Sequence, residues 1–83
     1  MSVHEIGIME SALDAALAQA RSRGGGRLRR IVLQVGNLSG ADPDSLRFAF
    51  TALAPLSEAA GAELDIEPAP GRELNLVRLE LEA

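Results

Sequence analysis

Three consecutive glycines, Gly24, Gly25 and Gly26, separate two segments with different hydrophobic periods. Before the glycines, apolar residues recur at spacings of three and four, which is typical of an amphipathic helix. They are Ile6, Met9, Leu13, Leu17 and Ala20. Because three glycines cannot sustain a helix and readily adopt left-handed conformations at its end, we expect a helix over residues 6–22. The chain must then turn and continue as a different element.

The segment after the glycines is typical of a β-strand. Residues 28–35 are rich in β-branched side chains, and apolar residues alternate with polar ones. Val32 interrupts the alternation, which indicates that the second face of this strand is partly covered. Asp42 and Pro43 then predict a second helix, because Asp is a good N-cap and Pro is tolerated at the first helical position.

One face of this second helix is apolar and carries Leu46, Ala49, Phe50 and Leu53. Pro55 should break or kink the helix, leaving residues 56–60 as a short extra turn. Phe48 points away from the apolar face, and two interpretations remain open. It packs under the segment after Pro55, which we prefer, or it contacts a partner protein.

The last third of the chain predicts two more strands. Residues 63–67 alternate apolar and acidic side chains, and residues 73–81 form a strand whose apolar positions change phase between Leu76 and Val77. A β-bulge at that point would keep five apolar residues on the core side. They are Leu74, Leu76, Val77, Leu79 and Leu81. Residues 68–72 form a connection of hairpin length. The fold class is therefore α+β in the order α-β-α-β-β, with two helices on one face of a three-stranded sheet.

Composition excludes several functions. The 83 residues fit one small domain, and 47% hydrophobic residues with a net charge of −4 are typical of a globular chain. With two phenylalanines and no Tyr or Trp, no platform for stacking nucleic-acid bases exists. There is no segment of membrane-spanning length, so we expect a cytoplasmic protein. One histidine, no cysteine and no phosphate-binding loop argue against an enzyme.

Three motifs in order resemble the HypA/HybF family of nickel metallochaperones, which act in nickel-iron hydrogenase maturation. The first is His4-Glu5 followed by Ile8-Met9-Glu10-Ser11-Ala12-Leu13. The second runs from Val35-Gly36-Asn37-Leu38-Ser39-Gly40 into Pro43 and Leu46-Arg47-Phe48-Ala49-Phe50. The third is Gly71-Arg72-Glu73-Leu74 leading into Leu79-Glu80-Leu81-Glu82. The similarity covers essentially the whole chain, so residues 1–83 are identified as a single HypA-like nickel-binding domain.

The resemblance implies a metal site and partners. His4 is implied as the principal Ni(II) ligand, Glu5 as a helper and Asp42 as a loop carboxylate. From the residues alone, Glu5 is equally an early-helix acid that suits the helix dipole, and Asp42 is fully explained as an N-cap. The implied partners are a maturation GTPase of the HypB type, the hydrogenase large subunit, or both. Phe48 is a candidate partner contact, and a homodimer is open.

Two departures from the family pattern matter. The family's zinc lobe, with two Cys-x-x-Cys pairs, is absent, and residues 68–72 stand in its place, so no zinc is expected. Ser2 and Val3 also separate His4 from Met1, where the family typically begins Met-His-Glu. If Met1 is removed, the Ser2 amine, the intervening amides including that of Val3, and the His4 imidazole can hold Ni(II) or Cu(II) in a square plane. The alternative is a metal-free HypA-like scaffold that kept the fold and the partner surface.

Overall fold

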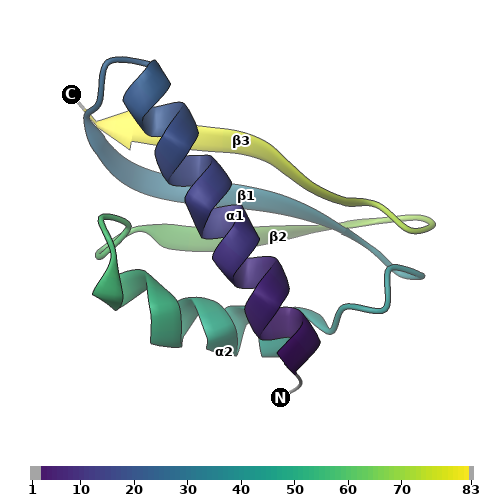
Figure 1. The fold of residues 1–83 in the computed structure, drawn as a ribbon. Helices are drawn as coiled ribbons and strands as arrows, with labels where there is room; N and C mark the ends of the chain where they lie inside the picture. Colours follow the sequence, from purple (N-terminus) through teal and green to yellow (C-terminus); the bar gives the residue numbers. More distant parts are fainter. Residues whose placement is uncertain (1–2, 83) are drawn as a thin grey trace.

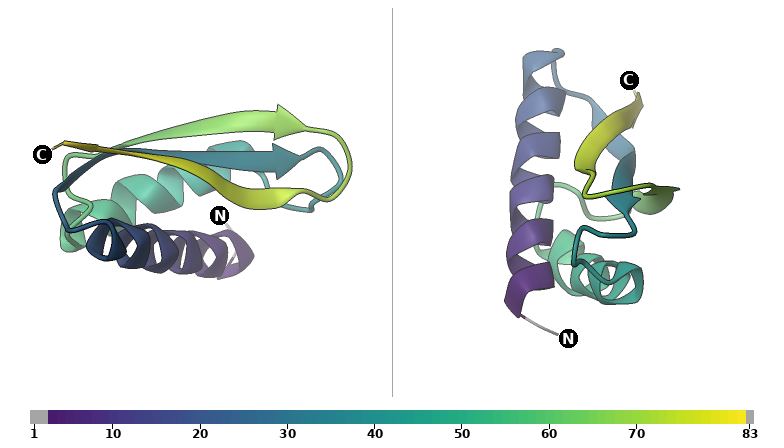
Figure 2. Two further views of the ribbon diagram at one scale, coloured as in Figure 1. Left: turned by 90° about the horizontal axis from the view of Figure 1, so that it is seen from above. Right: turned by 90° about the vertical axis from the view of Figure 1, so that its right-hand side faces the viewer.

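The computed structural model describes residues 3–82 and confirms the predicted α+β fold (Figure 1). Its elements follow the predicted order. They are α1 (Val3–Ser22), β1 (Arg27–Gly36), α2 (Pro43–Leu53), a 3-10 turn η1 (Ala54–Leu56), β2 (Glu63–Ala69) and β3 (Leu74–Glu82). Both helices lie on the same face of the sheet, and the other face is left uncovered (Figure 2). None of the helices within residues 3–82 combines the length and the apolar character that crossing a bilayer needs.

The helix boundaries agree with the sequence except at the start of α1. The helix ends at Ser22, as the glycines predict, but it begins at Val3, three residues before the expected Ile6. His4 and Glu5 in this first turn are polar, and the prediction began the helix at Ile6, the first residue taken into the apolar stripe. Glu5 stabilises this turn in two ways. Its carboxylate accepts a hydrogen bond from the Asp42 backbone N–H, and its negative charge interacts favourably with the dipole at the helix N-terminus. Pro55 ends α2 as predicted, and the chain continues into η1.

The sheet has the strand order β2-β1-β3, so the connection between β2 and β3 is not a hairpin. β1 pairs parallel with β2 and antiparallel with β3. The link 70–73 therefore crosses over the end of β1. β1 lies at the centre and is the most buried of the three strands, whereas β2 and β3 alternate mainly between exposed and half-buried residues.

Gly36, the last residue of β1, lies directly beneath this crossing link. Its N–H donates to the Glu73 carbonyl at 2.6 Å, and the next loop binds the link again through Leu38 N–H to the Gly71 carbonyl at 2.7 Å. A Cβ on Gly36 would collide with the carbonyl of Gly71 and lie 2.6 Å from the Glu73 nitrogen. Only glycine lets the link pass this close to β1.

The core lies between the helices and the sheet. α1 contributes Met9, Leu13, Ala16 and Ala20, and α2 contributes the predicted stripe of Leu46, Ala49 and Phe50, with Leu53 half-buried. β1 faces them with Leu28, Ile31, Leu33 and Val35. This arrangement confirms both predicted apolar stripes.

The predicted β-bulge is present, but it keeps four apolar residues on the core side and not five. Val32 pairs with Arg78 and Leu33 pairs with Leu76, so Val77 is the extra residue. Val77 is 45% exposed, whereas the other four apolar residues of β3 pack on or against the core. The bulge restores the phase of the strand by expelling one residue from the ladder.

Phe48 does not pack under the segment after Pro55, so the preferred interpretation from the sequence was wrong. Its side chain is 62% exposed on the outer side of α2. The α2 core face is already filled by its predicted stripe, and Phe48 follows Leu46 by two positions, which places it on the opposite side of the helix. Leu56, in η1, is 84% exposed.

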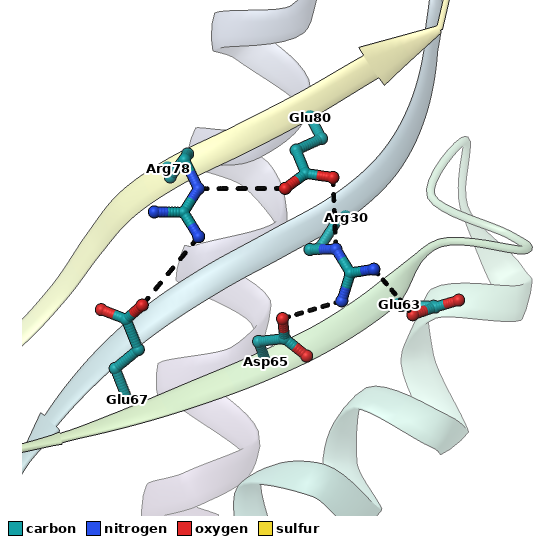
Figure 3. Close-up of polar contacts among 6 residues, drawn as sticks. All are labelled: Arg30, Glu63, Asp65, Glu67, Arg78 and Glu80. Carbon is teal, nitrogen blue, oxygen red and sulfur yellow. Dashed lines mark hydrogen bonds and ion pairs between the residues drawn. The ribbon is translucent and has the colours of Figure 1, made fainter.

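The uncovered face of the sheet carries charged side chains over Val32, which is fully buried. Arg30 on β1 binds Asp65 at 2.7 Å and Glu63 at 3.3 Å on β2, and it binds Glu80 at 3.2 Å on β3 (Figure 3). The hydrogen bond with Asp65, above all, raises the pKa of Arg30 above its ordinary value. One guanidinium thus links two outer strands that do not pair with each other.

Candidate metal centre

His4 lies in the first turn of α1 and its side chain is exposed. The side chain lines one end of an open groove between α1 and β3, with a volume of about 620 Å³. Because the first N–H groups of a helix have no intrahelical acceptor, the backbone nitrogens at this end of α1 are not committed to the helix ladder. The imidazole of His4, the predicted principal ligand, is accessible because the side chain is exposed.

Glu5 points to a different neighbour. Its side chain is only 5% exposed, and Oε2 accepts a hydrogen bond from the backbone N–H of Asp42 at 3.3 Å. Successive helical residues are rotated by about 100° about the axis, so the side chains of His4 and Glu5 leave α1 in different directions. Glu5 thus fastens the first turn of α1 to the loop that precedes α2.

Asp42 caps α2, as the sequence predicts. Its Oδ2 accepts from the Ser45 backbone N–H at 3.1 Å and from the Ser45 hydroxyl at 2.8 Å. These two bonds, the hydroxyl bond first, lower the pKa of Asp42 below its ordinary value and keep the side chain ionised at neutral pH. The carboxylate therefore has a complete structural role without any metal.

The structure brings two of the predicted metal residues together and leaves the third apart. Glu5 meets the backbone of Asp42, whereas His4 faces the groove. Within residues 3–82, no group of three or more His, Cys, Asp or Glu side chains is arranged to hold a metal ion. Val3 begins α1, and Ser2 lies outside the described residues.

The groove beside His4 was missed by the sequence reasoning. Its α1 wall consists largely of small residues at helical spacing and its sheet wall is apolar. Besides His4, the α1 wall is formed by Gly7, Ile8, Ser11, Ala12 and Ala15, and the sheet side includes Leu33, Leu74 and Leu76. None of the groove residues is an acid or an arginine.

Gly7 is a sequence signal that could have drawn attention to this part of α1. A glycine inside a helix costs about 0.5–1 kcal/mol relative to alanine, so a packing or functional reason is usually sought. A Cβ built on Gly7 meets no atom within 4 Å. The fold of this chain therefore does not require the glycine.

Comparisons with family models and with known proteins identify the same family. A sequence model described as HypA, hydrogenase/urease nickel incorporation metallochaperone, matches residues 3–74. The hydrogenase maturation factor HypA of Chlorobium limicola is 52% identical over 65 residues, which are 78% of this chain and 56% of that protein. The same factor of Pelodictyon phaeoclathratiforme is 45% identical over 69 residues, covering 83% of this chain and 59% of the relative. The chain thus matches less than two thirds of the length of these relatives.

A solved structure has the same fold. The solution structure of the Ni metallochaperone HypA from Helicobacter pylori superposes with a TM-score of 0.83 and covers 95% of this chain and 97% of that one. The sequence identity is 17%, so this likeness concerns the fold alone.

Proposed function

Since this chain belongs to the HypA family of hydrogenase and urease nickel-incorporation metallochaperones, we propose that it binds Ni(II) at its N-terminus for delivery in nickel-iron hydrogenase maturation. The family carries metal and is not enzymatic. The observation that supports nickel binding in this chain is the position of His4. It is the only histidine of the sequence, and it is exposed in the first turn of α1.

The proposed ligands are the His4 imidazole and backbone nitrogens that precede it. After removal of Met1, the Ser2 amine, the Val3 and His4 amides and the imidazole supply four nitrogens, and Ni(II) and Cu(II) favour such a set in a square plane. The α1 amides lack intrahelical acceptors, which supports their use, although the first turn must open to let them ligate. The 83 residues contain no cysteine to hold zinc through thiolates.

Glu5 and Asp42 have a different role in this proposal. Both carboxylates take part in hydrogen bonds of the fold, Glu5 to the backbone of Asp42 and Asp42 to Ser45. We propose that they hold α1 against the loop before α2 from Glu5 onwards, while the residues before Glu5 open to ligate nickel. If Met1 is retained, the alternative is a looser site that combines His4 with these two carboxylates, and forming it would require their side chains to move.

The proposed partners are a maturation GTPase of the HypB type and the hydrogenase large subunit, in the cytoplasm. Phe48 is the proposed contact for one of them, or for a second copy of this chain. A large apolar side chain that is 62% exposed on a short helix is suited to an interface.

A second function, a metal-free scaffold that keeps the partner surface, is favoured by one observation. Ser2 and Val3 separate His4 from Met1, whereas the family pattern begins Met-His-Glu. Such a module would bind the same partners and carry no nickel.

Native mass spectrometry of the untagged protein with and without Ni(II) distinguishes the two functions. We expect one nickel per chain that has lost Met1, none for His4→Ala, and retained nickel for Glu5→Gln, which keeps an acceptor for the Asp42 N–H. Binding should weaken as the pH is lowered, because protons compete with the metal for the nitrogen ligands. Equal nickel binding by His4→Ala would reject the proposed site, and the absence of nickel from the wild type would favour the scaffold.

A further inference from the structure

We propose that the groove between α1 and β3 receives an extended, uncharged apolar segment of the protein that exchanges nickel with His4. This inference rests on the proposed function, because it places the partner next to the proposed cargo. It assigns a role to a surface that neither the core nor the metal ligands use.

The dimensions of the groove fit a peptide segment. Its α1 wall runs from His4 to Ala15, which is roughly 16 Å along the helix axis and equals about five residues of extended chain. The volume of about 620 Å³ accommodates several side chains. Sites for small polar ligands gather several convergent polar groups, whereas here His4, Ser11 and Asn75 are the polar members of a mainly apolar lining.

The groove has no acidic side chain and no arginine, which favours an uncharged occupant. In a chain with 24% charged residues, none of the groove residues is an acid or an arginine. The opposite face of the sheet is lined by ion pairs, which include those of Arg30 with Asp65 and Glu80 (Figure 3). A charged segment would lose its hydration in the groove without gaining a partner, so apolar side chains are the complementary occupants.

Gly7 leaves open space on α1 at the His4 end of the groove. It is exposed, one turn after His4, and a Cβ there would contact nothing within this chain. A glycine at this position leaves room for the backbone of a bound segment beside the imidazole. The bound segment would then end within reach of the nickel site, and transfer would not require the partner to dissociate first.

The test fills the groove and leaves His4 itself unsubstituted. Ala15→Leu projects a larger side chain into the groove, and Gly7→Leu narrows its His4 end. Ala18→Leu is the matched control, because Ala18 is also exposed on α1 but does not line the groove. All three positions are exposed, so the variants should fold, and thermal unfolding followed by circular dichroism verifies this.

Each variant is titrated by biolayer interferometry against the purified maturation GTPase and, separately, against the hydrogenase large subunit. We expect Ala15→Leu and Gly7→Leu to weaken binding of the nickel-exchanging partner by at least about tenfold, and Ala18→Leu to stay within about twofold of the wild type. Unchanged binding of both partners by the two groove variants would overturn the proposal, as would a wild type that binds neither.

Nickel stoichiometry separates this proposal from the metal site. The groove variants should still bind one nickel in native mass spectrometry, because His4 and the backbone nitrogens are unchanged. If the wild type carries no nickel and Ala15→Leu still weakens partner binding, the proposed nickel site is rejected and the proposed docking groove is supported. If nickel binds normally and the groove variants bind both partners as the wild type does, the proposed docking groove is rejected and the proposed metal site is supported.

Discussion

At the scale of single residues, Asp42 shows how a candidate ligand is also a structural group. Its carboxylate caps α2 through two bonds from Ser45, and its backbone N–H is held by Glu5. The position of the loop relative to α1 therefore depends on one side chain from each element. A carboxylate whose pKa is lowered in the folded protein stabilises the fold more strongly when it is ionised, so the contribution of its charge can be measured as a function of pH.

We expect the stabilising effect of Asp42 to disappear in acid. Its pKa is lower in the folded protein than in the unfolded chain, where it is about 4. The ionised cap therefore stabilises the fold fully above that value, and the contribution is lost as the pH falls through the folded pKa. The urea midpoint of the wild type should exceed that of Asp42→Ala at pH 7, and the difference should shrink towards about pH 3.

Asp42→Asn is the control for this prediction, because asparagine also caps helices but does not titrate. The comparison should be made at pH values where both proteins fold reversibly. A difference between the wild type and Asp42→Asn that stays constant with pH would contradict the role of the charge.

At the scale of elements, β3 contains a bulge that allows most of its apolar residues to face the core although their sequence positions are out of phase. Two groups of apolar residues have opposite parity, and a regular strand would expose one group. The bulge at Val77 returns Leu79 and Leu81 to the core side. Val77 itself contributes little to packing, because it is 45% exposed, while Leu79 is 7% exposed.

The two residues should therefore respond differently to truncation. We expect Leu79→Ala to lower the free energy of unfolding by about 2–5 kcal/mol, the range for buried leucines. Val77→Ala should change it by no more than about 0.5 kcal/mol, as is usual for surface positions. Chemical denaturation of both variants measures the difference, and a cost at Val77 similar to that at Leu79 would show that the bulged residue is packed in solution.

At the scale of the whole molecule, the sheet is held together across its central strand. β2 and β3 each pair only with β1. The Arg30 guanidinium binds carboxylates from both outer strands, and these charged side chains cover the buried Val32. Arg78 adds weaker contacts to Glu67 and Glu80, both at 3.9 Å. The uncovered face is therefore closed by a network of ion pairs and not by a third layer.

Removal of Arg30 should destabilise the protein in a salt-dependent way. Arg30→Met leaves Glu63, Asp65 and Glu80 without their shared cation, so we expect a lower thermal midpoint at low ionic strength. The loss should be smaller in about 1 M NaCl, which screens repulsion between exposed charges. Arg78→Met is the matched control, and its effect should be smaller because its ion pairs are longer. Equal shifts for the two variants, independent of salt, would contradict a special role for Arg30.

Most elements of this molecule could be predicted from local sequence. Gly24 to Gly26 ended the first helix, Asp42 and Pro43 began the second, and the phase change after Leu76 located the bulge. Each of these features depends on a few neighbouring residues, whose conformational preferences act over one or two turns. The three ordered motifs were enough to identify the family, and His4 was marked as a candidate ligand by the same resemblance.

Other features were decided only by the tertiary structure. The order β2-β1-β3, the crossing over Gly36, the exposure of Phe48 and the groove beside Gly7 all depend on contacts between distant segments. Helical spacing shows that His4 and Glu5 diverge, but only the packing of α1 against the α2 loop and β3 decides what each one faces. Local preferences set the period and the ends of an element, whereas strand order and surface grooves follow from which arrangement buries the most apolar surface.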